Sequence, residues 1–207
     1  MQMKDKRRIG IFGGTFDPPH IGHQILAMEA YDDLQLDKLF WVLTPDPPHK
    51  TGKKIAPLEI RIQLVKAAID DDKIFEFSPV DINRPGPHYV VDTIREFRNE
   101  FPEAELIFIM GGDSLHNLAK WHHPHEFVNE CDWLAVMHRP GEKIELMAIE
   151  RAFPGITQKI HFIEAPLLEI SSNLIRKLIQ QKKPFRYYLP EQVYKIVLEN
   201  HLYLDNN

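Results

Sequence analysis

Short runs of consecutive apolar residues recur along the chain, and most of them lack the polar alternation of a half-exposed strand. Strands of this kind are typical of a parallel sheet that is covered on both faces. The runs that we interpret as buried strands are residues 9–12, 39–43, 106–110, 134–137 and 160–163.

Apolar residues at helical spacing lie between and beyond these runs. Leu58, Ile62, Val65 and Ile69 recur at steps of four, three and four, just after Pro57. Two further stripes follow near the C-terminus: Leu174, Ile175, Leu178 and Ile179, and then Val193, Ile196 and Val197 after Pro190. Strands that alternate with helices predict an α/β fold with a doubly wound parallel sheet. Ligands bind such sheets at the carboxyl ends of the strands, so we expect the chemistry in those loops.

The length of 207 residues suits one domain of ordinary size, and a hydrophobic content of 43% suffices for a substantial core. We therefore expect a single domain over residues 1–207. The helical segment from about residue 171 to 207 should pack on the same core, because no linker-like stretch precedes it.

Composition narrows the classes of function. A formal net charge of -5 disfavours a general nucleic-acid binder, which normally carries a basic surface. No apolar run approaches the length of a membrane-spanning helix, and the single cysteine, Cys131, can form no intrachain disulfide. The basic N-terminus leads into a glycine-rich run interrupted by Asp17, unlike a secretory signal. We expect a cytoplasmic protein that binds neither nucleic acid nor a membrane.

The first strand leads into a loop whose residues suit phosphate binding. Gly13 and Gly14 allow a ligand to approach bare backbone, and the helix that begins near His20 offers unpaired N–H groups. His20 and His23 are three residues apart and so share one helix face. Each feature alone fits equally a tight strand-to-helix connection with two surface histidines.

Taken together, Gly13-Gly14-Thr15-Phe16-Asp17-Pro18-x-His20-x-Gly22-His23 resembles the signature of the T/H-x-G-H nucleotidyltransferase superfamily, and most closely its nicotinate-nucleotide adenylyltransferase branch. Further segments resemble the same family from about residue 9 to about residue 198: Pro-Pro-His-Lys at 47–50, residues 84–93, Gly-Gly-Asp at 111–113, Arg-Pro-Gly at 139–141 and Ile-Ser-Ser-Asn-Leu-Ile-Arg at 170–176. Within residues 84–93 the chain departs from the family pattern, with His88 for a serine and Val90 for a threonine.

The resemblance implies a Rossmann-like nucleotidyltransferase fold and transfer of AMP from ATP to nicotinate mononucleotide, which releases pyrophosphate and serves NAD biosynthesis. It implies four residues that act on the phosphates during catalysis: His20, His23, Lys50 and Arg176. The residues that it implies for ATP binding are Gly13, Gly14, Thr15, Phe16, Gly111, Asp113, Ser171 and Ser172. Those that it implies for mononucleotide binding are Tyr89, Thr93, Trp121 and Arg139. Mg²⁺ is expected to accompany ATP through its phosphates.

Several of these residues also have a plain structural interpretation. Asp113 can accept hydrogen bonds from ribose hydroxyls or cap the following helix, and Trp121 can stack on a pyridinium ring or simply pack in the core. His122, His123 and His125 invite a zinc interpretation, but Pro124 breaks their helical spacing and no cysteine is near. We therefore expect no protein-held metal.

Two alternatives remain open. The acceptor could be nicotinamide mononucleotide or, less in keeping with the downstream motifs, phosphopantetheine. A protein that senses adenine nucleotides without catalysis would keep the glycine turn and Asp113, but would not need both histidines together with Lys50 and Arg176. The sequence does not indicate an oligomeric state.

Overall fold

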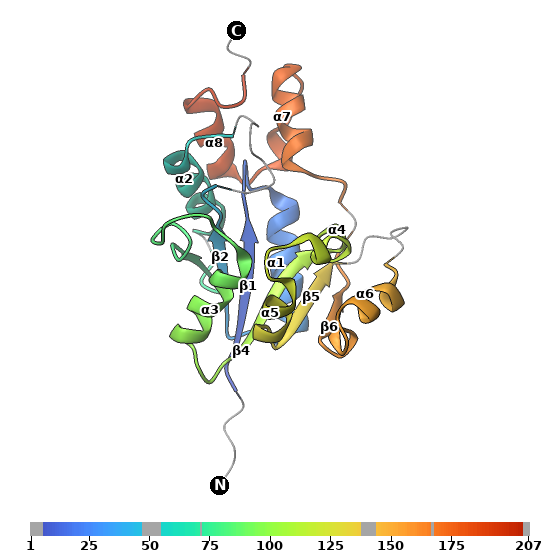
Figure 1. Cartoon of the computed structure of the whole chain (residues 1–207). Coiled ribbons are helices and arrows are strands. Elements are labelled where there is room, and N and C mark those ends of the chain that lie inside the picture. Colours follow the sequence, from blue (N-terminus) through green and yellow to red (C-terminus); the bar gives the residue numbers. More distant parts are fainter. Residues whose placement is uncertain (1–5, 47–54, 71, 138–143, 167, 205–207) are drawn as a thin grey trace.

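The computed structural model describes residues 6–46, 55–70, 72–137, 144–166 and 168–204. Its centre is a six-stranded parallel sheet of order β3-β2-β1-β4-β5-β6 (Figure 1). The strands are β1 (Arg8–Gly14), β2 (Lys38–Leu43), β3 (Phe75–Ser78), β4 (Glu105–Gly111), β5 (Trp133–Met137) and β6 (Ile160–Ile163). The predicted doubly wound α/β sheet is confirmed, and its strand order is that of a Rossmann fold.

Helices cover both faces of this sheet. One face carries α1 (Ile21–Asp33) and α2 (Leu58–Ile69), whereas the other carries α3 (Val90–Glu100) and α5 (Pro124–Glu130). The remaining helices are α4 (Gly112–His116), α6 (Leu146–Ala152), α7 (Ser172–Gln180) and α8 (Glu191–Glu199), with short 3-10 turns at Leu118–Lys120, Ile156–Gln158 and Arg186–Tyr188. No helix in the described ranges is long and apolar enough to cross a membrane.

Strand β3 is absent from the sequence-based prediction. Its four residues alternate apolar and polar, with Phe75 buried and Glu76 exposed, because β3 is an edge strand that pairs with β2 alone. Such a short run does not stand out as a continuous apolar segment. The other five strands were predicted within two residues at each end.

The C-terminal helices pack against the helices that follow β1 and β2. Ile175 and Ile179 of α7 and Val193 and Val197 of α8 belong to the same buried cluster as Leu64 of α2. In Figure 1, α7 and α8 lie beyond the carboxyl end of β1. This placement brings the C-terminal segment over the edge of the sheet where ligands are expected.

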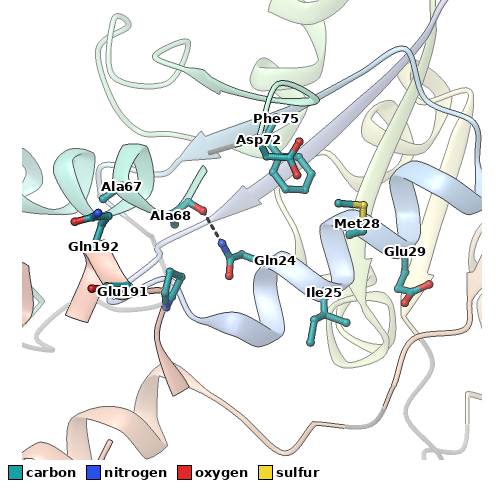
Figure 2. A pocket seen from close by; sticks show the side chains of 11 residues that line it. Gln24, Ile25, Met28, Glu29, Ala67, Ala68, Asp72, Phe75, Glu191 and Gln192 are labelled. Atoms are coloured by element: carbon teal, nitrogen blue, oxygen red, sulfur yellow. Dashed lines mark hydrogen bonds between the residues drawn. The ribbon is translucent and has the colours of Figure 1, made fainter. Parts of the chain in front are cut away.

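A shallow cavity of about 420 Å³ marks the junction of α1, α2 and the start of α8. Figure 2 shows the Gln24 side chain crossing this junction, where its amide donates to the Ala68 carbonyl at 2.7 Å. Gln24 directly follows His23, so this contact also fixes the first turn of α1 on α2. Ala67, Ala68 and Phe75 give the cavity apolar walls, while Glu29 and Glu191 lie at its rim.

Arg61 of α2 joins the loops at the carboxyl end of the sheet, although its side chain is 2% exposed. Its guanidinium donates to four carbonyl oxygens: Ala56 (3.0 Å), Thr15 (3.3 Å), Thr44 (2.8 Å) and Pro45 (2.6 Å). Burial lowers the pKa of Arg61, and the nearby Asp17 and Asp46 carboxylates oppose that shift. A charged group in this position stabilises the fold because its donors satisfy carbonyls that are buried, at Ala56 and Pro45, or partly buried, at Thr15 and Thr44.

We predict that Arg61→Met lowers the free energy of unfolding by about 3–5 kcal/mol, since it leaves two buried and two partly buried carbonyls without their donor. Arg95→Met is the matched control, because the Arg95 side chain is 42% exposed and pairs with Asp92 and Glu126 on the surface. Its loss should cost at most ~1 kcal/mol. Urea denaturation of both variants measures the difference, and equal losses would contradict the role given to Arg61.

Candidate functional site

The loop after β1, here named the signature loop (residues 13–20), leads directly into α1. His20 is the extended residue before the helix, with φ -145° and ψ 170°, and His23 is the third helical residue. The His20 backbone N–H donates to Nδ1 of His23 at 3.1 Å, and the two imidazole rings stack with centroids 3.6 Å apart. Because Nδ1 accepts, the neutral His23 ring carries its proton on Nε2, where it can donate to an anion.

Buried aromatic rings pack against the signature loop on its core side. Phe16 is 2% exposed, and its ring packs on His23 (5.2 Å between centroids) and on Trp41 (5.0 Å). A Cβ on Gly14 would approach the Phe16 ring to 2.8 Å, so a glycine is needed where the chain crosses this ring. The Phe16 side chain is therefore part of the core, and its main chain is what remains for the predicted contact with ATP.

The Ile-Ser-Ser-Asn-Leu-Ile-Arg motif at residues 170–176 contacts the signature loop, although more than 150 residues separate the two in sequence. Ser171 caps α7, its hydroxyl accepting from the Leu174 N–H at 3.1 Å. The Ser172 hydroxyl donates to the Pro18 carbonyl at 2.9 Å. Arg176 donates to the Asp17 carbonyl at 2.5 Å and also bonds the Asn173 side chain. The structure thus brings Ser172 and Arg176 to the loop that carries His20 and His23.

The Asp17 side chain points inward from the same loop and is 1% exposed. Its Oδ1 accepts from the Ala56 N–H at 3.2 Å and from the Tyr203 hydroxyl at 2.8 Å. Its Oδ2 lies 3.7 Å from Nη1 of Arg176. Burial and the adjacent Asp17 charge raise the pKa of the Tyr203 hydroxyl, which therefore stays a donor. Nothing in the sequence pattern pointed to Tyr203.

A cavity of about 570 Å³, here named the switch-point cavity, opens at the carboxyl ends of β1 and β4. It gathers seven predicted site residues: Gly13, Gly14, Thr15, Tyr89, Thr93, Gly111 and Trp121. It is also lined by residues that we did not predict, among them Thr44, Asp81, His88, Lys120 and His122. The predicted residues that do not line it are Phe16, His20, His23, Asp113, Ser171, Ser172 and Arg176. Lys50 and Arg139 lie outside the described residues.

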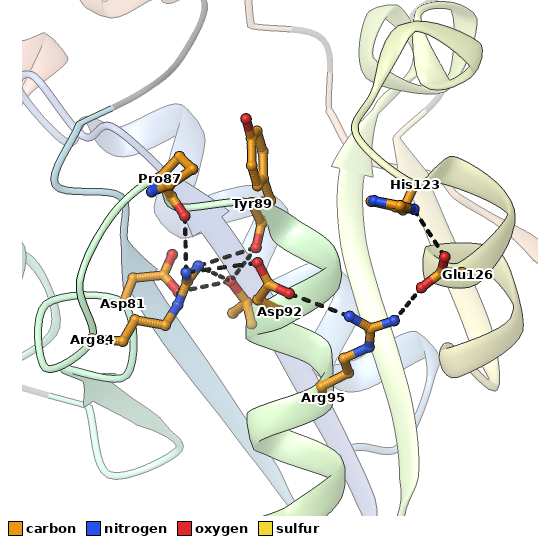
Figure 3. Close-up of polar contacts among 9 residues, drawn as sticks. Asp81, Arg84, Pro87, Tyr89, Asp92, Arg95, His123 and Glu126 are labelled. Carbon is orange, nitrogen blue, oxygen red and sulfur yellow. Dashed lines mark hydrogen bonds and ion pairs between the residues drawn. The ribbon is translucent and has the colours of Figure 1, made fainter.

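One wall of the switch-point cavity is held by a buried ion pair (Figure 3). The Asp81 carboxylate accepts from the Thr93 hydroxyl at 2.7 Å and from Arg84 at 3.1 Å. Arg84 also donates to the Tyr89 carbonyl at 3.1 Å. Thr93 is 3% exposed, so its hydroxyl positions the Tyr89 segment from inside the protein. The Tyr89 ring stacks on His122, with centroids 3.8 Å apart.

His88 lies in the same wall, and the sequence signal for it was its departure from the family pattern. Its side chain is 7% exposed, and its buried Nδ1 has no hydrogen-bond partner among the described residues. Buried polar atoms are nearly always paired, so this nitrogen is an exception in the cavity wall.

Trp121 lies across the cavity, half-buried, with its ring against Phe108 (6.2 Å) and Phe127 (5.2 Å). Those contacts hold the indole and leave part of it facing the cavity. Of the neighbouring histidines, His123 pairs with Glu126 at 2.8 Å and His125 packs on Phe153. In the described ranges no group of three or more histidine, cysteine or acidic residues could hold a metal ion.

Asp113 does not cap the helix that follows β4, so that interpretation is wrong. Gly111 occupies the capping position, and Asp113 lies exposed in the first turn of α4. A Cβ on Gly111 would approach Oδ1 of Asp113 to 2.7 Å, so this glycine makes room for the carboxylate. The carboxylate is free of a capping role and can meet a hydroxyl of a ligand.

Comparison with known proteins places this geometry in a family. Residues 11–178 match the model of the Cytidylyltransferase-like family. The chain is 38% identical over 196 residues to a Thermomicrobium roseum protein named "Probable nicotinate-nucleotide adenylyltransferase", covering 95% of this chain and 91% of that relative. A Bacillus pumilus protein of the same name is 36% identical, with 95% and 98% covered.

Among solved structures, the chain resembles Plasmodium falciparum nicotinic acid mononucleotide adenylyltransferase complexed with NaAD. The TM-score is 0.77 at 18% identity, with 95% of this chain and 97% of that chain covered. The same protein complexed with APC gives a TM-score of 0.75. This likeness confirms the fold. The family match and the identity over nearly the whole chain show that the protein belongs to the nicotinate-nucleotide adenylyltransferases of the Cytidylyltransferase-like family.

Proposed function

We propose that this protein transfers AMP from ATP to nicotinate mononucleotide, giving nicotinate adenine dinucleotide and pyrophosphate. The observation that carries the proposal is that residues suited to phosphate binding and a cavity with aromatic walls lie next to each other at one end of the sheet. A histidine pair stands at the start of α1, and the switch-point cavity with Tyr89 and Trp121 opens beside it. The glycines of the signature loop line the cavity and join the two.

ATP is assigned to the signature loop and the start of α7. Nδ1 of His23 accepts from the His20 backbone, so Nε2–H is the donor that we assign to the phosphates, and the His20 ring stacks on His23. The first-turn amides of α1 and α7 add N–H donors and a favourable dipole. Arg176 supplies positive charge from α7, and Asp113 is assigned to the adenosine ribose.

The mononucleotide is assigned to the switch-point cavity. The faces of Trp121 and Tyr89 suit a flat cationic pyridinium ring. The imidazole of His88 and the ammonium of Lys120 are side-chain groups in the lining that we assign to its anionic carboxylate or phosphate. We also assign Lys50 and Arg139 to phosphate contacts from the sequence motifs.

The reaction requires no protein nucleophile. A phosphate oxygen of the mononucleotide attacks the α-phosphorus of ATP, one P–O bond forms, and the bond to the β-phosphate oxygen breaks as pyrophosphate leaves with the electron pair. The protein contributes position and hydrogen bonds to the charge that shifts onto the phosphates. We propose that Mg²⁺ arrives with ATP, coordinated by phosphate oxygens and water.

The first test is release of pyrophosphate from ATP and Mg²⁺, with nicotinate mononucleotide and nicotinamide mononucleotide assayed side by side. We expect preferential use of the nicotinate substrate and loss of activity on chelation with EDTA. Equal use of both acceptors would make the protein a dual-specificity enzyme. ATP binding without pyrophosphate release from either would instead indicate the nucleotide sensor.

We expect His23→Ala to lower kcat on the order of 10²–10³-fold, because one directed donor to the transition-state charge is lost. The KM for the mononucleotide should change little, since His23 does not line the switch-point cavity. Steady-state kinetics with each substrate varied in turn measures both effects. The matched control is His125→Ala, which removes an exposed imidazole that packs on Phe153. Unchanged turnover in His23→Ala would remove this residue from catalysis.

A further inference from the structure

Tyr203 follows α8 near the end of the described chain and reaches the signature loop. Its hydroxyl donates to Oδ1 of Asp17 at 2.8 Å, a contact between residues 186 positions apart. The backbone of Tyr203 has φ 63°, a left-handed conformation that non-glycine residues rarely adopt. Such a conformation persists where surrounding contacts hold it, so the hydroxyl is directed at Asp17 by the packing of the C-terminal segment.

Asp17 is a buried anion whose hydrogen bonds come from other parts of the chain. Both of its donors, the Tyr203 hydroxyl and the Ala56 N–H, meet the same oxygen, Oδ1. Oδ2 has no hydrogen bond within the described ranges, and the Arg176 guanidinium lies 3.7 Å away. A buried carboxylate with two donors is sensitive to the loss of either, because water cannot replace it.

The main chain at Asp17 holds the groups assigned to ATP. The Asp17 carbonyl accepts from Arg176 at 2.5 Å, and the next carbonyl, that of Pro18, accepts from Ser172 at 2.9 Å. His20 follows two residues later and caps the start of α1, which begins at Ile21. A shift of Asp17 would therefore move Arg176, Ser172 and the histidine pair together.

We propose that Tyr203 is a positioning residue for the ATP side of the reaction. It touches no substrate, and it acts through Asp17 to fix residues 17–20 of the signature loop, and with them Arg176 and the first turn of α1. Residues 13–15, which line the switch-point cavity, are held separately, by the pairing of Gly13 and Gly14 with β2 and by the bond from Arg61 to the Thr15 carbonyl. Tyr89 and Trp121 are held by contacts to His122 and to Phe108 and Phe127, so the mononucleotide side does not depend on Tyr203. This inference rests on the proposed function, which assigns ATP to the signature loop.

The test is Tyr203→Phe, which removes the hydroxyl and keeps the ring. A hydrogen bond to a charged group is worth about tenfold in an equilibrium, so we expect kcat to fall about tenfold and the KM for ATP to rise about threefold or more. The KM for nicotinate mononucleotide should stay within twofold. Because KM does not depend on the fraction of folded enzyme, this split separates positioning from a loss of stability. Assays are run well below the melting temperature of each variant.

Tyr187→Phe is the matched control, since Tyr187 is 87% exposed and loses the same hydroxyl at the surface. A double-mutant cycle with Asp17→Ala, which removes the acceptor of the Tyr203 hydroxyl, tests the route of the effect. If Tyr203 acts through Asp17, the double variant should be no worse than Asp17→Ala alone. Additive losses in the double variant would overturn the proposal. So would an equal rise in the KM values for ATP and for the mononucleotide, or a rise in the KM for ATP below about threefold.

The two proposals can fail separately. If the wild-type protein releases no pyrophosphate with either mononucleotide, the proposed function fails. Calorimetric titration with ATP then decides the role of Tyr203. Weaker ATP binding in Tyr203→Phe than in Tyr187→Phe supports positioning of the signature loop, and equal binding overturns it.

Discussion

Four main-chain carbonyls in the loops at the carboxyl end of the sheet converge on the guanidinium of Arg61. They belong to the loops that leave β1 and β2 and to the segment that enters α2. Beyond the last ladder pair a parallel strand no longer offers hydrogen-bond partners, yet buried carbonyls require them. A planar cation with five donors meets that need from one point. The walls of the switch-point cavity at Thr15 and Thr44 are therefore placed by a residue that lines no part of it.

Because of the strand order, the loops at this end of the sheet lead to helices on both of its faces. From β1 the chain crosses to the face that carries α1, and from β3 and β4 it crosses to the face that carries α3 and α5. The groups assigned to the ATP phosphates lie at the starts of α1 and α7, and Asp113, assigned to the ribose, lies on α4. The groups assigned to the mononucleotide lie around α3 and α5. The glycines at the end of β1 lie between them. The donor and the acceptor of the AMP group can thus approach each other across this loop.

The sequence predicts the parts of this molecule that depend on local pattern. Continuous apolar runs indicate β1 and β4, and the signature loop is recognisable from its spacing. Arg61 was missed because an arginine in an amphipathic helix is typical of a solvated face, and its burial depends on loops distant in sequence. Asp17 was identified as one position of the signature and as an interruption of the glycine-rich run, and neither observation predicts that its side chain is buried. Its partner Tyr203 carries no local signal, because their contact exists only in the folded chain.

The same limit applies to the cavity lining. Thr93 was predicted from a motif, but its hydroxyl is bonded to Asp81, and only the structure distinguishes that inward role from contact with a ligand. His122 was considered as a metal ligand, whereas its ring stacks on Tyr89. In both residues the side-chain type is compatible with either role, and the neighbours decide between them.

The bond between Asp17 and Tyr203 has a consequence for the order in which the protein can mature on the ribosome. The two residues lie 186 positions apart in the chain. The signature loop therefore leaves the exit tunnel long before its carboxylate can acquire this partner. The strands and helices of the N-terminal half can pair while translation continues, since domains fold from their N-terminal part as it emerges. The hydrogen bond to Asp17 that completes the support of the signature loop, by contrast, can form only after Tyr203 has emerged.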